Sequence, residues 1–500
     1  MKTKQTLLCG LIAAALSLIF TACLSTSRGA RVHTHQWGKW IQVSGDDATE
    51  ERVCKTDSAH RQTRLTGTDR FTFEEIGETA YRVRKGTLTT GEITIPAYYR
   101  PDANSEYLPV TEIGRDSDIS PPSGAFYSTS LTSIIIPDTI TSIGSSAFYD
   151  CTNLTSITIP VGITTIGIAA FLNCESLTSL TLPAGVTSIA LLTFSACSSL
   201  TNITIPASVT SIDSKAFSHC ISLTRITVDR NNPYYTSDGR ILYNKAKTEL
   251  IAFPSASGKV TIPAGVTTIS YGAFSVCTSL TSITFPASVT SIEGDNYLLS
   301  HSGAFAGCDS LISVIFAESS QLETIGNGTF SGCKNLTNIT IPASVRSIGE
   351  WAFDDCASLT NIIIPSSVRS VGIMAFHDTA WLNSQPDGLV YAGKVLYTYK
   401  GTMPDNTVIT NIRDDTIAIA DGALSHWSLT NITIPSSVAS IGRDAFRECF
   451  DLASIIIPPS VTSIGDGAFY SCDNLTVTIS RKTTIGKDAF PDGVTLIYSD

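Results

Sequence analysis

The stretch "FYDCTNLTSITIPVGITTIGIAAFLNC", residues 148–174, contains the unit that recurs along most of this 500-residue chain. Its Phe-x-x-Cys segment ends at Cys151 and returns at Cys174, and the prolines that follow Ile-x-Ile keep the same step at Pro137, Pro160, Pro183 and Pro206. An Ala-Phe-like pair occurs 14 times between Ala125 and Phe490. Repetition at a fixed period predicts a stack of similar coils rather than the three or so globular domains that the length alone suggests.

The order of apolar residues within the unit predicts the path of one coil. In Leu-Thr-Ser-Ile-Thr-Ile the Leu and Ile positions face inward, and β-branched residues favour a short strand that proline then ends. The Val and Ile of the next segment fill the core on the return, a glycine turns the chain, and Ala-Phe places a ring inside. The spacing of the prolines, about 23 residues, is typical of leucine-rich repeats. We therefore predict a leucine-rich repeat solenoid of about 14 coils with short parallel strands over residues 126–500.

Three insertions interrupt this rhythm, at residues 231–255, 293–303 and 382–407. The first and the last contain Asp-Gly followed by alternating aromatic and β-forming residues, which predicts inserted β-hairpins. Residues 71–125 also alternate and include the first fragments of the repeat, so we expect a β-rich cap there.

The N-terminus reads as an export signal. Lys2 and Lys4 precede an apolar run, Leu7–Phe20, which is too short to span a bilayer but suits a signal peptide over residues 1–22. The segment "FTAC" resembles a bacterial lipobox, which implies that Cys23 carries the lipid; the alternative is an ordinary cleaved signal with a chance cysteine. Because Leu24 and Ser25 are not acidic, we expect a lipid-anchored protein that reaches the cell surface at the outer membrane.

Residues 23–70 differ in composition from the repeats, and we interpret them as a tether or a small His/Trp/Cys module. His33, His35, Cys54 and His60 are candidate zinc ligands by residue type, although their spacing fits no standard zinc pattern. The plain alternative is an aromatic-pinned linker that binds no metal.

The units "SLTNITIPASVTSI" (199–212), "TFSGCKNLTNITIP" (329–342) and "NPYYTSDGRILYNK" (232–245) resemble the BspA-type leucine-rich repeat family of bacterial surface antigens. The resemblance covers roughly residues 75–490. It implies surface display, adhesion to host extracellular matrix or cell-surface proteins such as fibronectin, and binding of other bacteria. The family brings no catalytic motif to transfer.

The regularly spaced thiols could bind a metal, form disulfides, react, or simply pack in the core. Ten cysteines occupy the Phe-x-x-Cys position: Cys151, Cys174, Cys197, Cys220, Cys277, Cys308, Cys333, Cys356, Cys449 and Cys472. The same position holds Thr129, Thr379, Trp427 and Gly493 in sibling repeats, an exchange that argues against a ligand or catalytic role. Neighbouring coils lie about 4.8 Å apart, but equivalent Cβ atoms point the same way, which opposes disulfide geometry even in an oxidising compartment. We predict buried, unpaired cysteines that act as small hydrophobic residues.

The outward strand positions predict the presented surface, a sheet covered by Ser, Thr and Asn, with Thr155, Thr158, Thr201 and Thr204 as candidate binding residues. Cross-strand threonines are also ordinary strand residues, which is the alternative. Departures from the pattern are further candidates, because arginine and aromatic residues dominate binding hot spots. These are Arg225, Tyr234, Tyr235, Phe316, Tyr391, Tyr397 and Tyr399; cross-strand packing within the hairpins is the competing interpretation of the tyrosines.

Composition narrows the function classes. A net charge of −11, a pI near 5.1 and no dense run of Lys or Arg exclude a nucleic-acid-binding surface. No serine-hydrolase, zinc-protease or Walker motif occurs, so we expect neither an enzyme nor a cofactor. The expected function is a lipid-anchored surface adhesin or interaction protein that binds through the solenoid face. The alternative is a structural or antigenic spacer without a dedicated ligand.

Overall fold

The computed structural model describes residues 41–42, 49–53, 61–65, 71–86, 90–100, 105–114, 124–294 and 303–499. The chain divides into two compact units, Met1–Phe73 with Lys85–Leu88 and Glu74–Arg84 with Thr89–Asp500.

The first unit contains a three-stranded antiparallel sheet. Its strands are β1 (Ile41–Gln42), β2 (Thr49–Val53) and β3 (Arg61–Leu65), in the order β1-β2-β3. The predicted lipidation site Cys23 and the weak metal candidates His33, His35, Cys54 and His60 lie outside the described residues.

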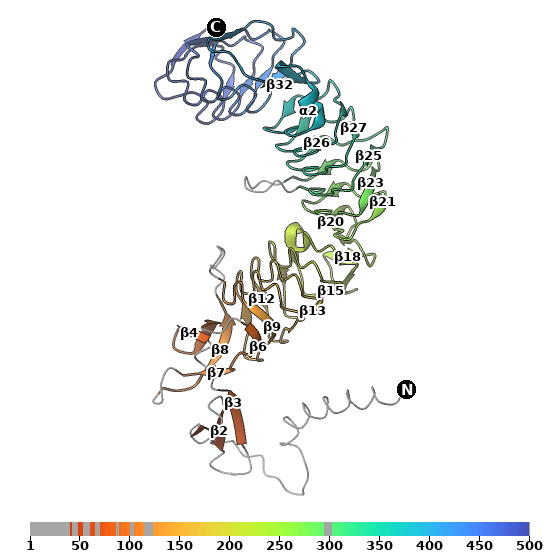
Figure 1. Ribbon diagram of the computed structural model, residues 1–500, viewed down its shortest axis with the longest axis vertical. Helices are drawn as coiled ribbons and strands as arrows, with labels where there is room; N and C mark the ends of the chain where they lie inside the picture. Colours follow the sequence, from red (N-terminus) through yellow and green to blue (C-terminus); the bar gives the residue numbers. More distant parts are fainter. Residues whose placement is uncertain are drawn as a thin grey trace. The chain divides into compact units, whose positions relative to one another are not determined.

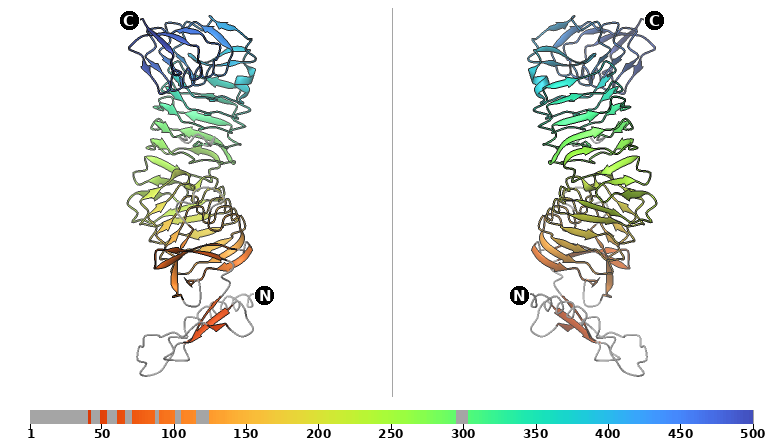
Figure 2. Two further views of the ribbon diagram at one scale, coloured as in Figure 1. Left: turned by 90° about the vertical axis from the view of Figure 1, so that its left-hand side faces the viewer. Right: turned by 90° about the vertical axis from the view of Figure 1, so that its right-hand side faces the viewer.

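The second unit is a β-solenoid of about 16 turns of roughly 23 residues (Figures 1 and 2). Each turn contributes one strand to a series of parallel sheets on one side of the solenoid. We call these strands the long strands. They are β6 (Thr90–Thr94), β9 (Ser130–Ile135), β11 (Ser156–Thr158), β13 (Ser179–Thr181), β15 (Asn202–Ile205), β17 (Arg225–Val228), β21 (Gly258–Thr261), β23 (Leu280–Phe285), β25 (Ser313–Phe316), β27 (Asn338–Thr340), β29 (Asn361–Ile363), β33 (Thr407–Ile409), β35 (Leu429–Ile432), β37 (Ser454–Ile456), β39 (Thr476–Ile479) and β41 (Thr495–Tyr498).

A second series of sheets forms on the return path of the coils. Its strands are mostly two residues long: β8 (Leu108–Ile113), β10 (Ser142–Ile143), β12 (Thr165–Ile166), β14 (Ser188–Ile189), β16 (Ser211–Ile212), β22 (Thr268–Ile269), β24 (Ser291–Ile292), β26 (Thr324–Ile325), β28 (Ser347–Ile348), β30 (Ser370–Val371), β34 (Ala418–Ile419), β36 (Ser440–Ile441), β38 (Ser463–Ile464) and β40 (Thr484–Ile485). The remaining elements are β4 (Phe71–Ile76), β5 (Ala80–Lys85), β7 (Tyr98–Tyr99), β18 (Tyr235–Ser237), β19 (Leu242–Asn244), β20 (Glu249–Ala252), β31 (Gly388–Ala392), β32 (Val395–Lys400), the 3-10 helix η3 (Ser214–Phe217) and helix α2 (Ala380–Ser384).

The prediction of a leucine-rich repeat solenoid is confirmed, and the register shows that one period of the sequence closes one coil. Ile157 of β11 pairs with Ile134 of β9, one period earlier, and Ile143 of β10 pairs with Ile166 of β12. All four side chains are buried. Before residue 125, β6 and β8 pair in parallel with β9 and β10, so strands that lack the Ala-Phe pair also join the stack.

Phenylalanine rings form the spine of the core at the turn of each coil. Phe126, Phe148, Phe171, Phe194 and Phe217 stack with ring centroids 5.3–6.0 Å apart. A second stack runs from Phe274 to Phe376 and a third from Phe446 to Phe490. Rings at such separations in offset geometry add to the free energy of burial.

The two longer insertions form hairpins where the stack is interrupted. In the first, Asp238 and Gly239 lie in the turn between the antiparallel strands β18 and β19, and Gly239 has φ +100°. In the second, Gly388 begins β31, and the two residues Gly393 and Lys394 turn the chain into β32. The predicted hairpins are therefore confirmed, with a different turn in the second.

Candidate binding surface

The outward residues of the long strands form one continuous type of surface, which we call the strand face. Strand alternation places Ile157 of β11 in the core while Ser156 and Thr158 are exposed. Equivalent residues of successive strands stay in register, as Thr181, Thr204 and Thr227 do on β13, β15 and β17. The strand face therefore consists of rows that run across the strands.

One row uses its hydroxyl groups inside the scaffold. The Oγ1 atom of Thr155 donates to the backbone carbonyl of Thr132, one coil earlier, at 3.1 Å, and Thr201 donates to Thr178 at 3.2 Å. Further members of this donor row are Thr178, Thr224, Thr360 and Thr430. Thr155 and Thr201 are exposed as predicted, but their donors are already engaged, so they offer a partner mainly methyl groups and oxygen lone pairs.

A second row, three residues further along each strand, has free side chains. Within the described chain the hydroxyls of Thr158 and Thr204 make no hydrogen bond, and both side chains are exposed. Isoleucine takes this position in five strands. We call this row the open row; its isoleucines are Ile135, Ile315, Ile363, Ile456 and Ile497, with exposed fractions of 49–70%.

The strand face carries almost no charge. Glu92 on β6, the predicted candidate Arg225 on β17 and Lys259 on β21 are exposed there. The long strands from β23 to β41 contain no Asp, Glu, Lys or Arg. This surface differs from the rest of a chain whose net charge is −11. A partner that binds to it therefore needs no positively charged surface of its own.

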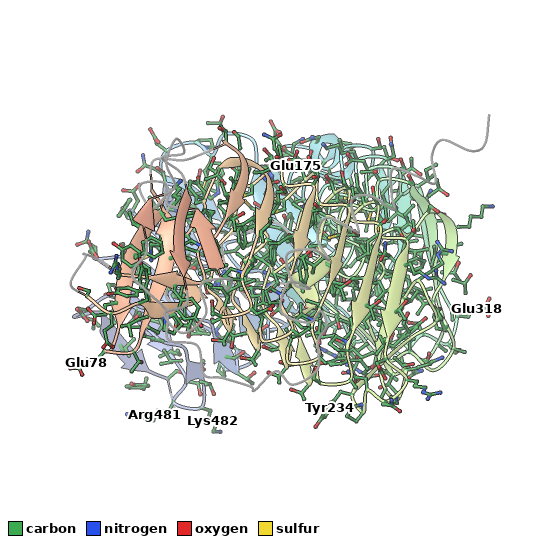
Figure 3. All side chains as sticks on the ribbon, turned by 90° about the horizontal axis from the view of Figure 1, so that it is seen from below. Glu78, Glu175, Tyr234, Glu318, Arg481 and Lys482 are labelled. Atoms are coloured by element: carbon green, nitrogen blue, oxygen red, sulfur yellow. The ribbon has the colours of Figure 1, made fainter. Side chains whose placement is uncertain are left out.

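In the first hairpin the two predicted tyrosines have different environments. Tyr234 is 52% exposed, and its side chain projects from the ribbon in Figure 3. The hydroxyl of Tyr235 accepts the backbone N–H of Ile212 at 3.0 Å, and burial raises the pKa of this phenol. Tyr235 therefore ties the hairpin to the preceding coil, and Tyr234 is the residue available to a partner.

In the second hairpin the predicted tyrosines pack against the solenoid. The prediction of a binding role for Tyr397 is corrected, since its side chain is only 4% exposed, its hydroxyl accepts the Phe376 N–H at 3.0 Å, and its ring packs edge-on against Phe376. Tyr391 lies under the Arg413 guanidinium at 4.1 Å, and Tyr399 contacts Trp427 at 5.4 Å between ring centroids. Both are half-buried.

Phe316 is also half-buried, and it ends β25 at an inward-facing register position. Its ring stacks on Phe285 with centroids 5.0 Å apart. The unusual residue at this position therefore packs against the edge of the core and does not belong to the strand face.

The prediction of buried, unpaired cysteines is confirmed for all ten Phe-x-x-Cys residues. Their role is more specific than that of a small hydrophobic residue. The Sγ of Cys174 donates to the backbone carbonyl of Phe148 at 3.2 Å, and Cys197 does the same to Phe171. Where threonine replaces cysteine, Thr129 and Thr379 donate to Phe126 and Phe376 of their own coils. Where this position holds cysteine or threonine, the side chain is therefore a buried hydrogen-bond donor, a role that the residue pattern alone did not reveal.

These thiols are not poised for chemistry. Burial raises the pKa of Cys220 to about 12 and that of Cys472 to about 11, so neither is a thiolate at neutral pH. Nowhere in the described ranges do three or more His, Cys, Asp or Glu side chains converge to hold a metal ion. Among the same residues, no helix combines the length and apolar character needed to cross a bilayer.

Comparison with known proteins agrees with this architecture. The family model described as "BspA type Leucine rich repeat region (6 copies)" matches residues 120–238, 253–383 and 405–497. The chain belongs to the BspA-type leucine-rich repeat family. No curated protein matches.

Solved leucine-rich repeat structures resemble the chain to different extents. A leucine-rich cell surface protein from Faecalibacterium prausnitzii is 30% identical over 62% of this chain and 91% of its own, with a TM-score of 0.43. A leucine-rich repeat protein from Eubacterium ventriosum is 20% identical over 80% of this chain and 97% of its own, with a TM-score of 0.42. The pneumococcal vaccine antigen PcpA is 17% identical over 90% of this chain and 98% of its own, with a TM-score of 0.45.

Proposed function

We propose that this protein is a cell-surface interaction protein whose strand face binds an extracellular macromolecule. The observation that carries the proposal is the open row, which presents unengaged threonines and isoleucines at a regular spacing on a sheet with few charged residues. Solenoids build extended binding surfaces of this kind, and exposed apolar side chains rimmed by polar ones mark protein contact sites. Membership of a family with a cell-surface relative supports the location.

The proposed partners are host matrix proteins such as fibronectin or the surface of other bacteria. A signal peptide over residues 1–22 and a lipid on Cys23 complete the proposal by holding the protein at the outer membrane. Labelling cells with a fatty-acid probe tests the anchor: wild-type protein incorporates the label, and a Cys23→Ser variant does not.

Substitutions in the open row test the binding surface. Ile456→Glu and Ile363→Glu place a charge among uncharged neighbours, and we expect each to weaken binding to immobilised fibronectin or to partner bacteria at least tenfold. Val161→Glu is the matched control, since Val161 is 85% exposed but lies in the turn after Pro160, off the strand face.

The competing function is a structural or antigenic spacer with no dedicated ligand. It is favoured if wild-type protein binds no matrix protein and no bacterium, or if the open-row variants bind as well as Val161→Glu. Metal analysis of the purified protein tests the remaining proposal of a zinc module at His33, His35, Cys54 and His60; no stoichiometric zinc would remove it.

A further inference from the structure

The turn side of the last coils carries a cavity of about 190 Å³ that is separate from the strand face and lined mostly by charged residues. Its charged lining consists of Arg443, Arg447, Lys487, Asp444, Asp466 and Asp488. Three consecutive coils supply these residues. All but one follow the glycine of Ser/Thr-Ile-Gly by one or two positions, and Arg447 directly follows an Ala-Phe pair. In two of the first coils the positions after that glycine are uncharged, with Ser145 and Ser146 or Ile168 and Ala169. The repeat therefore does not require charge there.

A glycine in the middle coil opens the cavity. Asp444, Gly467 and Asp488 occupy the same left-handed position of successive turns, with φ between +50° and +61°. A Cβ added at Gly467 would lie 2.5 Å from Oδ1 of Asp444, so any other residue would fill the notch. Tyr470, 44% exposed, lies beside it under the Arg447 guanidinium at 4.8 Å.

The cations of the cavity retain unused hydrogen-bond donors. Arg447 contacts Asp444 through Nη1 at 3.4 Å and Glu448 through Nε at 3.3 Å, and its Nη2 has no partner among the described residues. The Lys487 ammonium is 83% exposed and approaches only Asp488, at 3.9 Å, within the described chain. Nε of Arg443 is buried without a hydrogen bond and is paired only with the Asp444 carboxylate, at 3.6 Å, within the described chain. Such donors favour a carboxylate, because charge-assisted hydrogen bonds are the strong ones.

The three aspartates restrict what that carboxylate belongs to. They equal the cations in number, so a ligand with further negative charge is repelled, and they do not converge as a metal site within the described chain. Ionised carboxylates only accept hydrogen bonds, so they suit a ligand rich in hydroxyl donors. The cavity is smaller than the pockets that usually hold drug-sized ligands and matches a single ring.

We propose that this cavity binds an acidic monosaccharide at the end of a glycan, with Lys487 and Arg447 holding its carboxylate. Asp466 and Asp488 accept hydrogen bonds from its hydroxyls, and Tyr470 contacts the apolar face of the sugar ring. The site is independent of the strand face, so failure of either proposal leaves the other standing.

Saturation-transfer NMR titrations on the purified full chain test the proposal with four probes: glucuronate, N-acetylneuraminate, glucose and the monocarboxylate propionate. We expect saturable binding of at least one acidic sugar that weakens with added salt, and weaker binding of both glucose and propionate. Lys487→Ala lowers the affinity about two- to fivefold, as expected for an exposed charge, and Tyr470→Ala lowers it further. Lys334→Ala, an exposed lysine on a distant coil, is the matched control and leaves the affinity unchanged.

Three outcomes overturn the proposal. Equal affinity for propionate means that the cavity recognises any carboxylate, including that of an acidic peptide. Equal affinity for glucose means that the cations do not contribute. No saturable binding of either acidic sugar means that there is no such site. Thermal melts of both variants verify folding, which the exposure of Lys487 and Tyr470 protects.

Discussion

The coils over residues 124–228 and those over residues 349–498 have the same kind of packed interior, but their turns carry different side chains. Both stack phenylalanine rings, and both bond a buried cysteine to the carbonyl of the preceding coil, as Cys174 does to Phe148 and Cys472 does to Phe446. In the second set the turns carry charge and large side chains, with Trp351 and Met374 where the flanking coils have Gly328 and Gly422.

Trp351 and Met374 have φ of +52° and +54°, a region that strains residues with a Cβ. The first set shows the same strain at this position, with Ser146, Ala169 and Leu192 at φ between +53° and +57°. The indole N–H of Trp351 donates to the Met374 sulfur at 3.4 Å, and Met374 is 47% exposed. The comparison teaches that stacking constrains the interior of every coil, while the size and charge of the side chains at the turns can differ between coils.

The largest expected effect tests whether the two interiors are equivalent. Phe171→Ala and Phe469→Ala each remove a fully buried stacked ring, and each should lower the free energy of unfolding by about 3–5 kcal/mol. Urea denaturation followed by circular dichroism measures both. A much smaller loss for Phe469→Ala would show that the last coils do not share the core energetics of the first.

An intermediate effect tests the cysteine position. Cys197→Ala removes the thiol donor of the Phe171 carbonyl, which keeps its bond from the backbone N–H of Cys174, and should cost about 0.5–1.5 kcal/mol in the same experiment. Cys197→Thr should cost less, because a buried threonine hydroxyl here can donate to the Phe carbonyl of its own coil, as Thr129 and Thr379 do, and so keeps a hydrogen bond although with a different acceptor. Equal losses for the two variants would mean that packing, and not the hydrogen bond, selects cysteine here.

The smallest effect concerns the charged turns. Burial raises the pKa of Asp421 above its ordinary value, although the backbone N–H of Arg443 donates to its Oδ1 at 2.7 Å. The native state therefore holds this proton to higher pH than the unfolded chain does. The contribution of Asp421 to stability is greatest below the unfolded pKa and is lost as pH rises through the native pKa.

Asp421→Asn keeps the acceptor and removes the buried charge. We expect a rise in Tm of about 2 °C or less at pH 7, and no rise at a pH below the unfolded pKa of the carboxyl. Thermal melts across this pH range measure it. A fall in Tm at pH 7 would show instead that attraction to Arg443 outweighs the cost of burial.

Much of the strand face followed from residue order, while the roles of individual side chains did not. Alternation correctly placed Thr155, Thr158, Thr201 and Thr204 outside. It could not separate Thr155 and Thr201, whose hydroxyls are engaged one coil back, from Thr158 and Thr204. That distinction depends on where each Oγ1 lies relative to the carbonyl of the preceding coil.

The sequence by itself determined the solenoid, its period and the buried state of the cysteines, because these follow from local periodicity repeated many times. Only the tertiary structure decided that Tyr397 is core, that the thiols donate to the preceding coil, and that residues 443–488 surround one cavity. The physical reason is that stacking sets contacts between residues one or more coils apart, where neighbours in space are not neighbours in sequence.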